Sequence, residues 1–171
     1  GTLGEQKETN YALRADMTRT EFIAEVTDGI LPPPQYFPKN AILNKMGCDS
    51  FENVLSKGNT ALSWDQFNAE IEGGALVLDV RPQSEFIHGF IPGSLFIGLN
   101  GTFAMWVGAL IEKINQKIIL IAPEGTEQEA ITRLSRVGYD NTAGYLKGGI
   151  DTYVKTGGQL NTITSISAGK L

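Results

Sequence analysis

Residues 122–127 have the setting of a catalytic loop but lack the side chains of one. The apolar run at 117–121 predicts a buried parallel strand, and the apolar spacing of residues 128–137 predicts a helix. A turn from a strand into a helix gathers backbone N–H groups and the positive end of the helix dipole, which suits an anion or a thiolate. The residues in this turn are Ala122, Pro123, Glu124, Gly125, Thr126 and Glu127.

These side chains offer no reagent for such chemistry. Ala122 supplies no nucleophile, Pro123 removes one amide donor, and three glutamates in or just after the loop would repel an anion. Two interpretations remain open. The loop is a vestige in which Thr126 and Glu129 cap the following helix, or it is a docking surface for a neighbouring domain. Both predict a loop that does not catalyse.

Two other side chains could in principle react. Cys48 is the only thiol and so the only possible persulfide carrier, but the neighbouring carboxylate of Asp49 disfavours its thiolate. We therefore interpret Cys48 as inert. His88, the only histidine, lies in a polar turn with no nucleophile to activate. One histidine also falls short of a multi-histidine metal site, so the sequence predicts no metal and no cofactor in this chain.

Asp79 and Arg81 directly follow a predicted strand and could bind a ligand there. We interpret both as structural. Asp79 would accept amides of its own loop, and Arg81 would pair with a nearby acid such as Glu85.

Residues 58–158 alternate between short apolar runs and helical patterns. The sequence predicts strands at 60–62, 75–80, 95–97, 117–121 and 143–146, and helices at 63–72, 102–114, 128–137 and 150–155. This order is typical of an α/β fold with a mostly parallel five-stranded sheet and helices on both faces. Sites in open parallel sheets form beyond the carboxyl ends of the strands, where the loop at 122–127 lies.

The flanks of this region are different in character. Residues 1–57 are predicted to be irregular and partly helical. Their best helix spans 17–28, with a capping box between Thr18 and Glu21, and a stiff proline stretch follows it at 31–34. This segment lacks a core of its own and must pack on another surface. Residues 159–171 are a polar tail that we interpret as a disordered end.

Composition narrows the function classes. The chain has 171 residues and a formal net charge of −5, which argues against binding nucleic acid or an anionic membrane surface. It contains no apolar run long enough to span a membrane, which needs about 18 residues. A single cysteine fits a reducing, cytoplasmic environment.

Two signatures in this region resemble those of the rhodanese family. They are LDVR at 78–81 with SEF at 84–86 and GFIPGS at 89–94, and GYDN at 138–141 with LKGGI at 146–150. The resemblance implies a rhodanese-like α/β domain, whose active members carry sulfane sulfur on a cysteine that opens the loop after the fourth strand. By position, that cysteine corresponds to Ala122, and Glu127 and Gln128 replace its usual arginine or serine companions. Phe90 stands where the family commonly has histidine. The signature residues Asp79, Arg81, Glu85, Gly148 and Gly149 are then expected to be structural.

The flanks resemble part of a larger fusion protein. GEQK at 4–7, NYAL at 10–13 and LPPPQYFPKN at 31–40 are similar to the end of the metallo-β-lactamase-fold domain in proteins of the persulfide dioxygenase type. In such proteins, a rhodanese-like domain without its cysteine follows that domain, and a second rhodanese domain often comes next. The residues ISA at 166–168 are similar to the start of that second domain. The resemblance implies that Zn or Fe would belong only to the upstream domain.

The sequence thus predicts a C-terminal fragment with three parts: residues 1–57 from the upstream domain and linker, a rhodanese-like domain at 58–158, and a tail or the start of a following domain at 159–171. We expect a non-catalytic spacer or docking module in a parent that is a metal-dependent hydrolase or persulfide dioxygenase. Its partners would be the metallo-β-lactamase-fold domain and a second rhodanese domain. The alternatives are a sulfurtransferase that uses Cys48 and a small-ligand binding module.

Overall fold

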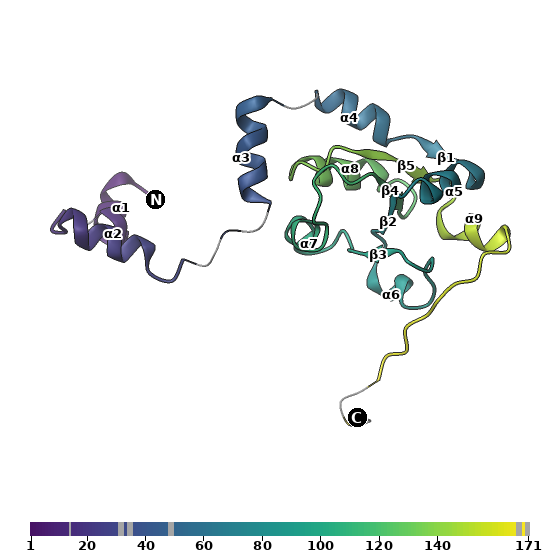
Figure 1. Ribbon diagram of the computed structural model, residues 1–171. Helices are drawn as coiled ribbons and strands as arrows, with labels where there is room; N and C mark the ends of the chain where they lie inside the picture. The colour runs from purple at the N-terminus through teal and green to yellow at the C-terminus, as the bar shows by residue number, and fades with distance from the viewer. Residues whose placement is uncertain (14, 31–32, 34–35, 48–49, 167–168, 170–171) are drawn as a thin grey trace. The chain divides into compact units, whose positions relative to one another are not determined.

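The computed structural model describes residues 1–13, 15–30, 33, 36–47, 50–166 and 169 (Figure 1). Cys48 and most of the predicted proline stretch lie outside these residues. Contacts divide the chain into two compact units, Gly1–Pro33 and Pro34–Leu171. No helix in the described part of the chain is long and apolar enough to cross a membrane.

The second unit is built on a five-stranded parallel sheet, which confirms the predicted fold class. Its strands are β1 (Ala61–Leu62), β2 (Leu76–Asp79), β3 (Leu95–Phe96), β4 (Ile118–Ile121) and β5 (Thr142–Leu146). They lie in the order β1-β5-β4-β2-β3, and every pair of neighbours is parallel. β2 and β4 are in register from Leu76 opposite Ile118 to Asp79 opposite Ile121. This order puts the turns that follow β4, β2 and β3 side by side at one edge.

Helices cover both faces of the sheet because successive strand residues point to opposite sides. Leu78 and Leu120 pack in one core with α4 (Phe51–Gly58), α7 (Phe103–Leu110) and α8 (Glu127–Ser135). Ile119 and Ile121 pack in the other core with α5 (Trp64–Glu72) and α9 (Gly149–Lys155). The four residues of β4 are completely buried, as their unbroken apolar run predicts.

Local signals place several helix starts correctly. Thr18 and Glu21 form the predicted capping box of α2 (Arg19–Thr27), and Ser63 and Gln66 form that of α5. α7 ends at Leu110 rather than near residue 114. The backbone of Ile111 is extended, its side chain is buried in the core, and its carbonyl accepts a hydrogen bond of 2.6 Å from the Tyr139 hydroxyl. Burial raises the pKa of that hydroxyl above its ordinary value.

Two helices before residue 58 belong to the same compact unit as the sheet. Val54 of α4 is part of the core, and a Cβ on Gly58 would lie 3.0 Å from Ile131 of α8. Tyr36, just before α3 (Phe37–Met46), packs closely on Gly108 of α7. The boundary between the two compact units therefore falls after Pro33. The origin of residues 34–57 in an upstream domain stays a prediction.

The C-terminal tail is ordered as far as Ile163, which corrects the expectation of a disordered end. Phe90 and Asn161 form an antiparallel bridge with two N–H···O bonds of 3.0 Å each, and the amide of Ile163 donates to Ile87 at 2.9 Å. Leu160 packs directly over Gly89, where a Cβ would lie 2.6 Å from it. The tail thus closes against the turn between α6 (Gln83–Phe86) and β3.

The first unit has no buried residue among its described positions. It contains α1 (Leu3–Thr9), a 3₁₀ turn at Tyr11–Leu13, and α2. Six of its described large apolar residues are exposed: Leu3, Tyr11, Leu13, Phe22, Ile23 and Ile30. By itself this unit buries too little apolar surface to account for its own order.

Candidate functional site

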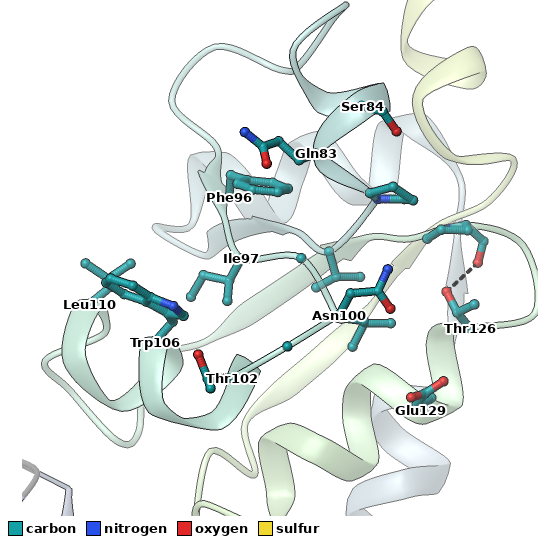
Figure 2. A pocket seen from close by; sticks show the side chains of 16 residues that line it. Gln83, Ser84, Phe96, Ile97, Asn100, Thr102, Trp106, Leu110, Thr126 and Glu129 are labelled. Atoms are coloured by element: carbon teal, nitrogen blue, oxygen red, sulfur yellow. Dashed lines mark hydrogen bonds between the residues drawn. The ribbon is translucent and has the colours of Figure 1, made fainter.

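A cavity of about 820 Å³ lies at the carboxyl ends of β2, β3 and β4 (Figure 2). Its wall comes from residues 80 and 82–84 after β2, from 96–102 at and after β3, and from three residues of the turn into α8. Trp106 and Leu110 of α7 complete it. This is the edge where parallel sheets place their sites, because the turns that follow adjacent strands converge there.

The turn after β4 is held by hydrogen bonds to its own backbone. Thr126 occupies the position that begins α8, but its side chain does not cap that helix. Its hydroxyl donates instead to the Pro123 carbonyl at 2.8 Å, and its amide donates to the same oxygen at 3.1 Å (Figure 2). Gly125 has φ = 85°, which an L side chain rarely adopts. The capping role expected of Thr126 is therefore wrong.

Unlike Thr126, the acidic residues Glu127 and Glu129 stabilise the start of α8 through their charge. Glu127 and Glu129 lie in the first turn of α8, where a negative charge complements the helix dipole. Glu129 forms an ion pair of 2.6 Å with Arg133, one turn further along the helix. Arg133 also donates to the Leu99 carbonyl at 2.6 Å, which ties the turn after β3 to α8. The positive charge of Arg133 is thus paired with the Glu129 carboxylate, and its guanidinium also binds the Leu99 carbonyl.

Ala122 is half-buried and packs against the core on the α7 and α8 side of the sheet. It is not among the residues that line the cavity. Its carbonyl lies 3.5 Å from the point where a Cβ on Gly149 would stand. Gly148 and Gly149 both have positive φ, 75° and 56°, which lets the turn into α9 pass this close to the loop.

Asp79 and Arg81 form a buried ion pair. The two nitrogens Nη2 and Nε of Arg81 bind the Asp79 carboxylate, with the shortest contact 2.6 Å from Nη2 to Oδ2. The Arg81 amide also donates to Oδ1 at 3.1 Å, and Nη2 donates to the Gly89 carbonyl at 2.8 Å. The pairing of Arg81 with Glu85 expected from the sequence is wrong. Glu85 is exposed on α6, whereas Asp79 is within reach because the chain turns sharply after β2.

The structure does not bring the remaining candidates together. His88 is exposed and does not line the cavity. Cys48 lies outside the described residues. Within the described part of the chain, no three histidine, cysteine, aspartate or glutamate side chains gather as metal ligands.

Sequence reasoning missed most of the cavity wall. Phe96, Asn100, Thr102 and Trp106 were not identified as site residues, although they lie in or after a predicted strand that ends at the same edge as residue 122. A signal was present in the apolar pair Trp106 and Leu110, which lie one turn apart on the exposed side of α7.

The family model of the rhodanese-like domain matches residues 63–156, more than half of the chain. No curated protein matches the sequence.

Solved structures show the same fold at low identity. A metallo-β-lactamase from Staphylococcus aureus subsp. aureus COL superimposes with a TM-score of 0.65 and 24% identity, covering 85% of this chain and 40% of that one. The BH2092 protein from Bacillus halodurans gives a TM-score of 0.52 and 18% identity, covering 73% of this chain and 86% of that one. The rhodanese-like domain of the Alr3790 protein from Anabaena sp gives a TM-score of 0.50 and 20% identity, covering 63% of this chain and 86% of that one. The chain therefore spans well under half of the Staphylococcus aureus protein.

Replacing the buried carboxylate of Asp79 leaves the Arg81 guanidinium without its counter-ion. We expect Asp79→Ala to lower the free energy of unfolding by about 3–5 kcal/mol, because an uncompensated buried charge is strongly unfavourable. Glu85→Ala serves as the matched control and should change stability by less than about 0.5 kcal/mol. Denaturant unfolding of both variants measures the difference, and equal effects would contradict the pairing.

Proposed function

This chain belongs to the rhodanese-like domain family, and on that premise we propose that it is a non-catalytic member. It would serve as a spacer or docking module in a larger metallo-β-lactamase-fold protein of sulfur metabolism, a hydrolase or a persulfide dioxygenase.

The observation that carries the first half of this proposal is Ala122 at the opening of the turn after β4. Sulfane-sulfur transfer through this turn needs a thiolate to attack the donor and hold the sulfur as a persulfide. A methyl group forms no such bond. The amide and the hydroxyl of Thr126 both donate to the Pro123 carbonyl, so neither is free to bind an anion. The charged side chains of the turn are carboxylates. An anionic donor or intermediate would meet repulsion there instead of stabilisation.

The second half rests on the first unit and on one structural likeness. The described part of the first unit exposes six large apolar residues, and a neighbouring apolar surface would cover them. The likeness to the Staphylococcus aureus metallo-β-lactamase covers 85% of the chain, which is more than the family match at 63–156. We infer that an upstream metallo-β-lactamase-fold domain supplies that surface and carries the Zn or Fe. A second rhodanese domain after the tail would be the further partner.

Direct assay of sulfur transfer tests the catalytic half. With thiosulfate or glutathione persulfide as donor and cyanide as acceptor, we expect no thiocyanate above background from this chain or from its Cys48→Ser variant. Activity that disappears in Cys48→Ser would overturn the proposal and identify a sulfurtransferase with a relocated nucleophile.

Restoring the thiol should not restore the reaction. We expect Ala122→Cys to transfer sulfur at least about 100-fold more slowly than a catalytically active rhodanese, since even one lost oxyanion donor costs about 10²–10³ in rate. Adding Glu124→Gln and Glu127→Gln to that variant should raise the rate, because these changes remove the repulsion of the thiolate. Robust transfer by Ala122→Cys alone would show that the acidic turn tolerates an anion.

Hydrogen exchange tests the docking half. Amides of α1 and α2 should exchange far faster than those of β4 in this chain, since no described residue of the first unit is buried. In a polypeptide that also contains the upstream domain, α1 and α2 should become protected, while α5 serves as the unchanged control. Equal exchange of α1 and α2 in both proteins would contradict docking through this unit.

A further inference from the structure

We propose that the cavity at the carboxyl ends of β2, β3 and β4 is a binding site for an uncharged aromatic compound that carries hydroxyl or amide groups. This inference goes beyond the docking role above and does not depend on it.

The size and the apolar part of the wall fit a small aromatic molecule. At about 820 Å³ the cavity lies within the 300–1,000 Å³ typical of small-ligand sites. Trp106 and Leu110 line it, yet their side chains are 57% and 48% exposed. Figure 2 shows them on the same side of the cavity as Phe96, with Thr126 and Glu129 on the other side. A planar ring placed against Trp106 would bury apolar surface that the described chain leaves in water.

The polar part of the wall has unused hydrogen-bonding capacity. Ser84, Asn100 and Thr102 line the cavity, and within the described residues none of their side chains makes a hydrogen bond. Two hydroxyls and one amide can both donate and accept, so they suit a ligand with groups of the same kind. Ser84 comes from α6, and Asn100 and Thr102 come from the segment between β3 and α7.

The charge of the wall selects against anions. Among the described residues, Glu129 is the only ionisable one that lines the cavity. Arg133 lies behind it, and its guanidinium is held by Glu129 and the Leu99 carbonyl. Because Glu129 and Arg133 neutralise each other and no other charged side chain lines the wall, a carboxylate or phosphate ligand would lose hydration there without gaining a counter-ion. This preference is opposite to that of a loop built to stabilise an anion.

Phe96, one aromatic residue of the wall, is held in place before any ligand arrives. Phe96 stacks on Phe86, and Phe86 stacks on Phe90, with ring centroids 4.4 Å apart in both pairs. Phe90 is in turn bridged to Asn161 of the tail. A side chain fixed in this way loses little conformational entropy on binding, which favours affinity for a small ligand.

Titration followed by NMR tests the site with two matched pairs of probes: nicotinamide against nicotinate, and adenosine against AMP. A Trp64→Phe background leaves Trp106 as the only indole, and Trp64 lies in the opposite core. With probes up to about 10 mM, we expect both uncharged probes to shift the Trp106 indole N–H signal and both anions to bind at least about tenfold more weakly.

Variants separate this site from unspecific binding. Followed through the Gly98 and Gly101 amides in the natural background, Trp106→Ala should weaken nicotinamide binding about tenfold through the loss of ring stacking. Met105→Ala, at an exposed neighbour that does not line the cavity, should change it less than twofold. Glu129→Gln should bring nicotinate to within about threefold of nicotinamide.

Three results would each overturn the proposal: neither uncharged probe shifts the indole signal, Trp106→Ala binds as tightly as Met105→Ala, or nicotinate matches nicotinamide in the unaltered cavity. None of these measurements involves sulfur transfer, so their outcome is independent of whether the turn after β4 is catalytic.

Discussion

The buried pair of Asp79 and Arg81 is the contact on which the functional edge of this domain depends. It ends β2, turns the chain sharply, and reaches the carbonyl of Gly89 eight residues later. The segment held between these points contains α6 and the turn that carries Phe86 and Phe90. On one side, residues 82–84 of this segment form part of the cavity wall, and on the other side Phe90 pairs with the tail. One ion pair therefore holds a segment that contributes both to the cavity wall and to the attachment of the C-terminal tail.

The turn after β4 keeps its conformation with an alanine at residue 122. β4 is completely buried and α8 packs on the core, so the turn between them is positioned by the same forces as in any domain of this fold. Its conformation requires only Gly125 and the bonds from Thr126 to Pro123. Because no reacting side chain takes part in those contacts, an alanine at residue 122 does not disturb the fold.

The two compact units differ in what stabilises them. The sheet of the second unit buries apolar residues on both faces, and α3 and α4 add to it through Tyr36 and Val54. The first unit has well-formed helix caps at Thr2 and Thr18 but no buried residue among those described. Caps fix where a helix begins, and each contributes only about 1 kcal/mol. A segment with caps and no core depends on a neighbour for its order.

Adjacent residues in the sequence determined the strands, the capping boxes of α2 and α5, and the absence of a nucleophile at residue 122, because each of these depends on local spacing or on a single side chain. The antiparallel bridge at Phe90, the helix α4 and the partner of Arg81 were not predicted correctly. Each depends on which groups meet in space, and sequence distance alone did not decide between Asp79, two residues before Arg81, and Glu85, four residues after it. The cavity is the clearest case. Its wall joins segments after β2, β3 and β4, which become neighbours only through the strand order β4-β2-β3. That order is set by packing of the whole sheet between two layers of helices, and no short stretch of sequence contains it.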